Sequence, residues 1–147
     1  MDLKSGYPWW AVRNGLVHAF PPLQQDLHCD VLVVSSGVTG ALIANELSGH
    51  GHEVAVIEQR DIGWGSTAAS TALLQYEIDT HLLDLARQYG SDAAEAAYRA
   101  CAEAIPALGE AARGLKDVDF KRMDSLYLAS RHRDVPVLMA EGSARRQ

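Results

Sequence analysis

The sequence predicts an α/β protein organised around one strand–helix–strand unit, which lies between residues 29 and 71. Three observations lead to this prediction. Val31–Val34 form an apolar run, a turn with two glycines and a helical stretch follow it, and Glu53–Ile57 form a second run rich in apolar residues. The three elements span about 30 residues, the length of a single βαβ unit. We therefore expect two parallel strands connected by a crossover helix.

The elements of this unit follow from their residue types. Residues 1–28 contain three prolines and several aromatic side chains, so we expect an extended or irregular lead-in that lies over the surface of the domain. Val31–Val34 are consecutive and mostly β-branched, a pattern typical of a strand that is buried on both faces of a parallel sheet. The helix at 41–47 should end near Gly49 and Gly51, because glycine readily adopts the left-handed cap.

A loop and two helices are expected after the second strand. Residues 59–71 are rich in glycine, alanine and hydroxyl residues, a composition typical of a loop whose backbone approaches another group closely. A helical stripe of apolar residues begins at Thr80 and should stop at Gly90. A second helix begins at Asp92, and Pro106 is expected to kink or end it.

The pattern changes after residue 114. Residues 118–122 and 126–130 look like two short strands, and residues 135–141 begin like a helix. The predicted organisation has a lead-in segment, a βαβ domain with a helical extension, and the start of a further domain that is truncated; these parts are residues 1–28, 29–115 and 116–147.

Composition excludes several classes of function. The chain has 147 residues, of which 48% are apolar and 22% charged, and its net charge is -6. An acidic chain without a basic cluster is a poor ligand for nucleic acid. No apolar run approaches the roughly 18 residues that a membrane span requires, and the N-terminus lacks the apolar region of a signal peptide. Cys29 and Cys101 have no metal-ligand spacing, and the six histidines are scattered. We expect a cytoplasmic protein with reduced thiols and without a metal.

The turn after the first strand resembles a dinucleotide fingerprint with one glycine replaced. The three glycine positions of G-x-G-x-x-G fall on Ser35, Gly37 and Gly40. Gly37 would let the backbone approach a pyrophosphate, and Gly40 would let the helix pack closely on the strand. If the turn requires a positive φ at Ser35, the serine costs about 1 kcal/mol. Two glycines alone are equally compatible with a strand–turn–helix that binds nothing.

Glu58 strengthens the dinucleotide interpretation. It ends the second strand about 20 residues after the glycines, where a carboxylate can accept hydrogen bonds from an adenosine ribose. An exposed acid at a strand end is the alternative, but the joint spacing with Gly37 and Gly40 favours binding. A carboxylate there repels a 2′-phosphate, which argues against NADP. Arg60 and the Ser66–Thr67 pair either reach the pyrophosphate or serve as surface charge and helix cap.

Two runs in this region resemble a known family. Asp30–Val34 with Ser36-Gly37-Val38-Thr39-Gly40, and Val56–Thr71 with its Gly-Ser-Thr-Ala-Ala-Ser-Thr segment, resemble the N-terminal part of FAD-dependent oxidoreductases of the D-amino-acid oxidase and glycine oxidase family. The segment from Gly65 to Thr71 is the more specific of the two. The resemblance covers most of residues 28–130.

The resemblance implies a Rossmann-like FAD-binding domain in a flavoprotein that oxidises a small-molecule amine or amino acid by hydride transfer to the flavin. Members of the family are considerably longer, so the chain is expected to be an N-terminal, truncated portion. It would lack most of the substrate domain and the catalytic residues, of which we name none, and would not be competent alone. The residues that the resemblance assigns to FAD are Ser36, Gly37, Val38, Thr39, Gly40, Glu58, Gln59, Arg60, Gly65, Ser66 and Thr67.

Two other interpretations stay open. The chain could be a fragment of a nicotinamide-dependent dehydrogenase, although the loop from Gly65 to Thr71 argues against it. It could also be a non-catalytic remnant or an interaction domain that kept the fold and lost the cofactor, which Ser35 favours.

Overall fold

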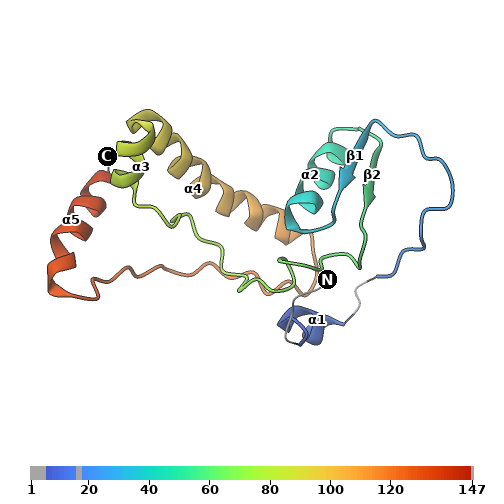
Figure 1. Ribbon diagram of the computed structural model, residues 1–147, viewed down its shortest axis with the longest axis horizontal. Coiled ribbons are helices and arrows are strands. Elements are labelled where there is room, and N and C mark those ends of the chain that lie inside the picture. The colour runs from blue at the N-terminus through green and yellow to red at the C-terminus, as the bar shows by residue number, and fades with distance from the viewer. Residues whose placement is uncertain (1–5, 16–17, 147) are drawn as a thin grey trace. The chain divides into compact units, whose positions relative to one another are not determined.

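The computed structural model describes residues 6–15 and 18–146. The chain divides into two compact units, Met1–Ala72 and Leu73–Gln147. The first unit contains α1 (Trp9–Asn14), β1 (Val31–Val34), α2 (Val38–Gly49) and β2 (Val54–Ile57). The second contains α3 (Leu82–Tyr89), α4 (Ser91–Arg113), the 3₁₀ helix η1 (His132–Asp134) and α5 (Val135–Ala144) (Figure 1).

The first unit contains the predicted strand–helix–strand arrangement. β1 and β2 are parallel, with Val31 opposite Val54 and Val34 opposite Ile57. α2 connects the two strands and packs on both of them. The protein is therefore a mixed α/β structure with a small parallel sheet, as its apolar runs indicate.

α2 faces the sheet along one line of residues. Gly40, Ala44 and Leu47 lie one turn apart along the helix and are half-buried. Val33 of β1 is the buried residue opposite them, with 8% of its surface exposed. After the helix, Gly51 takes a φ of 86°, so the predicted glycine stop is present.

The expected burial of β1 on both faces is wrong. Leu32 is 53% exposed and Val34 is 71% exposed. The physical reason is that among the described elements only α2 and β2 contact β1, and one helix can cover only one face of a sheet. An apolar β-branched run indicates a strand, but its burial depends on what lies over each face.

The lead-in is not irregular throughout, because it contains α1. Pro8 stands at the N-cap of this helix, and its carbonyl accepts a hydrogen bond from the amide of Val12 at 3.2 Å. Proline is tolerated at the start of a helix, where an amide would have no intrahelical partner. Residues 18–28 form no helix or strand, as expected for the rest of this segment.

The second unit is helical. α3 stops before Gly90 as predicted. α4 begins at Ser91 and continues through Pro106 to Arg113, so the proline does not end the helix. A proline removes one backbone hydrogen bond, and the bonds on either side keep α4 helical. Leu82, Ala94 and Tyr98 form the buried core where α3 and α4 meet. None of the described helices is long and apolar enough to cross a membrane.

The two strands expected at 118–122 and 126–130 are not present, since the structure assigns no strand to either described segment. Asp117 and Asp119 have positive φ values of 58° and 49°, which interrupt an extended backbone. The helix expected at 135–141 is present as α5. The domain boundaries after residues 28 and 115 stay a prediction.

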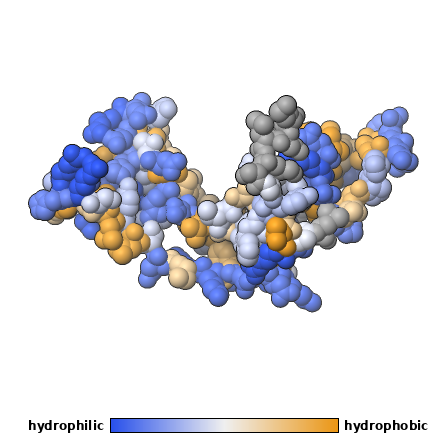
Figure 2. Space-filling model, turned by 60° about the horizontal axis from the view of Figure 1, so that its bottom comes forward, coloured by the Kyte–Doolittle hydropathy of each residue, from blue (hydrophilic) through white to orange (hydrophobic). Residues whose placement is uncertain are grey.

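A buried charge network joins the helices of the second unit. Glu141 of α5 is 2% exposed and accepts hydrogen bonds from the amides of Leu82 at 2.7 Å and Leu83 at 3.1 Å, at the start of α3. The Nε atom of Arg145 donates to Glu141 at 2.8 Å, and the Arg145 guanidinium lies 5.1 Å from the centre of the Tyr98 ring. The face in Figure 2 shows hydrophilic side chains with groups of apolar ones between them, and the exposed apolar residues of the chain include the neighbours Leu73 and Leu74 and the run Leu126–Leu128.

Candidate functional site

The turn between β1 and α2 lies at the carboxyl end of the sheet. The amide of Ser35 donates to the carbonyl of Ile57 at 2.8 Å, which extends the β1–β2 pairing by one bond. Ser35 takes a φ of 98°, a conformation that L-residues other than glycine rarely adopt. The turn therefore does require a positive φ at Ser35, and the serine carries the conformational strain that the sequence analysis expects in that case.

Gly40 is required by the close approach of α2 to this turn. A Cβ atom at Gly40 would lie 2.1 Å from the carbonyl oxygen of Ser35 and 3.3 Å from Val33 Cγ1. Such an overlap with backbone would force the helix away from the strand. Gly37 stands at the N-cap of α2, and a Cβ there would lie 3.2 Å from Thr67 Oγ1. The two glycines bring the helix start and the strand end together.

Glu58 bonds to the same turn. Its Oε2 atom accepts from the amide of Ser36 at 2.8 Å and from the Ser36 hydroxyl at 3.1 Å. Its Oε1 atom accepts from the amide of Arg60 at 3.1 Å. The hydrogen bond from the Ser36 amide, followed by that from Arg60, lowers the pKa of Glu58 below its ordinary value. A carboxylate that is held ionised therefore lies beside the N-terminus of α2.

The loop after β2 folds back onto the helix start. The amide of Val38, in the first turn of α2, donates to Thr67 Oγ1 at 2.9 Å. The amide of Gly63 donates to the carbonyl of Ser36 at 3.2 Å. Ala68 is 6% exposed and anchors the loop. The loop thus lies against the turn, as its glycine-rich composition indicates.

The structure brings together most of the residues that sequence reasoning selected, within the first unit. Ser36, Gly37 and Val38 meet Glu58 and Thr67 through the contacts above. Thr39 and Gly40 are in the same helical turn as Val38. The backbone amide of Arg60 hydrogen-bonds to the Glu58 carboxylate, and Gln59 lies between the two in the sequence.

Gly65 and Ser66 lie in the loop, where Gly65 has a φ of 81° and the Ser66 carbonyl accepts from the Ala69 amide at 3.1 Å. These bonds stay within the loop and do not join either residue to the turn. That the residues selected here bind a cofactor stays a prediction.

Two features of the site lay outside the sequence reasoning. The hydroxyl and amide of Ser36 both donate to one oxygen of Glu58, whereas the resemblance assigns Ser36 to FAD without a specific partner. The indole of Trp10 donates to the carbonyl of Ser70 at 2.8 Å, which joins the lead-in to the loop. Spacing offers no signal for either bond, because a serine and a tryptophan each have many partners within reach.

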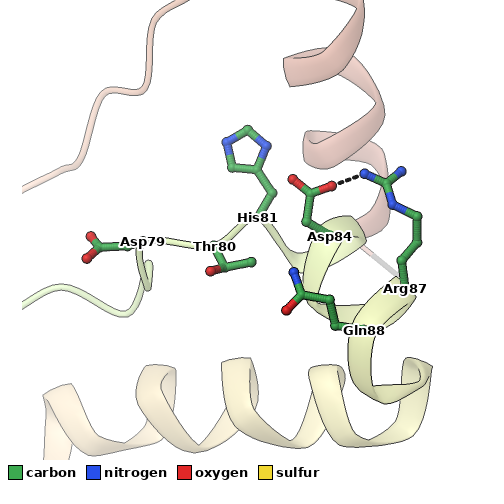
Figure 3. A pocket seen from close by; sticks show the side chains of 6 residues that line it. All are labelled: Asp79, Thr80, His81, Asp84, Arg87 and Gln88. Carbon is green, nitrogen blue, oxygen red and sulfur yellow. Dashed lines mark hydrogen bonds and ion pairs between the residues drawn. The ribbon is translucent and has the colours of Figure 1, made fainter.

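The second unit has an open depression of about 450 Å³ at the start of α3. Figure 3 shows that its polar side chains come from the end of the preceding segment and from α3, and that Asp84 is paired with Arg87. His81 Nε2 lies 2.8 Å from the hydroxyl of Tyr127. Among the described residues no group of histidine, cysteine or carboxylate side chains could hold a metal.

Comparisons with known proteins identify the family and several relatives of the chain. The family of FAD-dependent oxidoreductases matches residues 30–147. YhfW of Bacillus subtilis, named as a Rieske 2Fe-2S iron-sulfur protein, is 36% identical over 97 residues, which are 66% of this chain and 19% of that protein. OrdL of Haemophilus influenzae, named as an oxidoreductase, is 31% identical over 91 residues, which are 62% of this chain and 21% of that protein.

An aerobic glycerol-3-phosphate dehydrogenase of Staphylococcus epidermidis is 40% identical over 50 residues, 34% of this chain and 9% of its own length. No solved structure matches. The chain thus spans a small part of each of these relatives. Because the family match extends over most of the sequence, the chain belongs to the family of FAD-dependent oxidoreductases, whose cofactor is FAD.

Proposed function

We propose that this chain holds the adenosine-diphosphate end of FAD in a flavin-dependent oxidoreductase that acts on an amine or amino acid. The observation that carries the proposal is the 2.8 Å hydrogen bond between Glu58 and the Ser36 amide. It puts an ionised carboxylate at the end of β2 next to the N-terminus of α2. A bound dinucleotide uses both features, the helix N-terminus for its pyrophosphate and the carboxylate for its ribose.

The start of α2 fits the pyrophosphate. An α-helix leaves its first four amides without intrahelical partners and carries a partial positive charge at this end. Thr67 satisfies the Val38 amide, and the amides of Thr39 and Gly40 are the next in the turn. The absence of a side chain at Gly37, and the close approach that Gly40 permits, leave the backbone accessible to an anion.

Glu58 fits the ribose. A carboxylate has about four acceptor positions, and three good hydrogen bonds from the protein already reach Glu58. The remaining capacity suits a ribose hydroxyl, and the lowered pKa keeps the acceptor ionised at neutral pH. The same charge disfavours a 2′-phosphate at this position. We therefore expect FAD to be held mainly through its phosphates, with one or two sugar contacts.

The reaction we propose for the whole protein is removal of a hydride from a substrate carbon next to an amine. FAD supplies the hydride acceptor when bound. Hydride transfer requires an enclosed pocket that holds the substrate over the flavin ring, and the turn and loop described here are half-exposed. We therefore propose that this chain alone binds FAD weakly and supports no turnover.

Since Cys29 and Cys101 are free thiols, we place the enzyme in the cytoplasm.

A titration tests the proposal. Flavin fluorescence should report saturable binding of FAD to the chain, with NAD binding more weakly or not at all. Glu58→Gln should weaken FAD binding about 10- to 100-fold, because a hydrogen bond to a charged group contributes roughly 1.5–3 kcal/mol. Glu53→Gln, at the opposite end of the same strand segment, is the matched control and should have no effect. Equal losses in both variants, or no FAD binding at all, would refute the proposal.

A second candidate function is a non-catalytic interaction domain. The observation in its favour is that protein side chains already bond to the amides of Ser36 and Val38, while Ser35 occupies a position with a φ of 98°. Ser35→Gly distinguishes the two candidates. If FAD affinity rises, the pocket is otherwise intact; if neither protein binds FAD, the interaction domain is favoured.

A further inference from the structure

The lead-in contacts the loop at residues 59–71 in two places. Trp10 of α1 donates its indole N–H to the carbonyl of Ser70 at 2.8 Å. The ring of Tyr7 meets the ring of Trp64 edge-on, with 6.2 Å between the centroids. The hydrogen bond joins residues that are 60 positions apart in the sequence. The segment before β1 is therefore attached to the loop that follows β2.

A continuous series of hydrogen bonds leads from this attachment to the start of α2. Trp10 bonds to the carbonyl of Ser70, and the amide of Ser70 donates to the carbonyl of Thr67 at 3.3 Å. Thr67 Oγ1 then accepts from the amide of Val38 at 2.9 Å. Three bonds thus connect the lead-in to the first turn of the helix.

The loop needs such an attachment. Residues 59–71 form turns and no helix or strand, so their conformation is not maintained by a ladder of backbone hydrogen bonds. Holding one loop residue in a single conformation costs about 1–2 kcal/mol of backbone entropy. Ala68, which is buried, is one anchor of the segment that carries Thr67. The bond from Trp10 is a second anchor, two residues beyond it.

We propose that Trp10 is a positioning residue, which holds the loop so that the hydroxyl of Thr67 caps α2 at the cofactor site. Its effect on FAD rests on the proposed function, whereas its effect on the Val38 amide does not. Trp10 is half-buried, and the adjacent Trp9 is 65% exposed. The neighbouring tryptophan therefore provides a matched control of identical chemistry.

The test compares Trp10→Phe with Trp9→Phe in the full chain by amide hydrogen exchange and FAD titration. Trp10→Phe removes the N–H donor and should speed exchange at the Val38 amide about 2- to 10-fold, the range expected for one hydrogen bond. It should weaken FAD binding by a similar factor. Trp9→Phe should change neither quantity. Unchanged exchange at Val38 in Trp10→Phe, or equal changes in both variants, would overturn the proposal.

A double-mutant cycle with Thr67→Val separates positioning from general stability. If Trp10 acts through Thr67, Trp10→Phe should have no further effect on FAD affinity once Thr67 is valine; additive losses would overturn the proposal. If the wild type binds no FAD, the proposed function fails and the exchange rate at Val38 decides the inference. Should Trp10→Phe unfold the first unit, benzothienylalanine at position 10 keeps the ring shape without the N–H donor and gives the same two outcomes.

Discussion

Removal of the Glu141 carboxylate should destabilise the second unit strongly and leave the first unit intact. Glu141 is 2% exposed and connects α5 to the start of α3 through the amides of Leu82 and Leu83. Burial by itself would raise the pKa of Glu141, but the two amides and Arg145 outweigh it, so the pKa lies below its ordinary value. The native network therefore contains an ionised carboxylate.

The magnitude follows from what Glu141→Ala leaves behind. Two amides at the start of α3 lose their acceptor, and Arg145, whose side chain is 15% exposed, loses its closest carboxylate. Breaking a buried ion pair from one side costs about 3–5 kcal/mol. Glu77, 3.7 Å from Arg145 Nη1, remains and offsets part of this loss. We expect a loss of about 3–4 kcal/mol, a large share of a typical free energy of unfolding.

Two spectroscopic probes separate the units during urea unfolding. All three tryptophans, at positions 9, 10 and 64, belong to the first unit, so tryptophan fluorescence reports on that unit. Far-UV circular dichroism reports mainly on the second unit, whose helices α3, α4 and α5 have 8, 23 and 10 residues against 6 and 12 in α1 and α2. The circular dichroism midpoint should fall, and the fluorescence midpoint should not move.

Glu110→Ala is the control for this experiment. Glu110 pairs with Arg113 at 2.6 Å on α4, but both side chains are well exposed. Exposed pairs of this kind contribute at most about 1 kcal/mol. The reasoning is wrong if Glu141→Ala costs no more than Glu110→Ala, or if both probes shift by the same amount.

Three further predictions concern the turn and the network. Gly40→Ala places a Cβ 2.1 Å from the Ser35 carbonyl, so FAD binding should be lost and the fluorescence midpoint in urea should fall. Ser35→Gly relieves a φ of 98° and should raise the stability of the first unit by about 1 kcal/mol, measured by the same fluorescence. The pKa of Glu141 is lowered in the folded state, so its ionisation stabilises the second unit. This contribution to stability is complete above about pH 4.3, the ordinary glutamate pKa, and is lost as the pH falls through the lower folded pKa. A circular dichroism titration should show this loss, and Glu141→Gln should flatten it.

The strand–helix–strand unit was predictable because its signals are local. Two apolar runs, at Val31–Val34 and Val54–Ile57, and a helix between them define the elements without reference to the rest of the chain. The exposure of Leu32 and Val34 was not predictable, since it depends on which elements cover the sheet. The strands expected at 118–122 and 126–130 are absent for a related reason, because a strand forms only where its backbone pairs with a neighbouring strand.

The candidate site was predictable where one residue type is needed for one backbone position. Gly40 is such a case, because any side chain there would overlap the Ser35 carbonyl. Thr67 is the opposite case, since a hydroxyl can cap its own helix or a distant one, and its partner Val38 lies 29 residues away. The pairing of Glu141 with Arg145 has the i, i+4 spacing of a helical ion pair, but its burial depends on α3.

Ser35 occupies the first glycine position of the dinucleotide fingerprint, and the structure shows what this departure from the fingerprint does to the turn. A non-glycine residue with positive φ is strained by roughly 1–2 kcal/mol, and the contacts of its hydroxyl with Glu58 at 3.5 Å and with the Gly37 amide at 3.4 Å are too long to offset this. The turn nevertheless persists, because the Ser35 amide bonds to Ile57 and Gly40 packs on the strand. The surrounding fold therefore imposes the glycine conformation on a serine. The serine therefore costs stability while its backbone keeps the positive φ of a glycine turn, so we expect any effect on FAD to come from its hydroxymethyl group beside the proposed phosphate site.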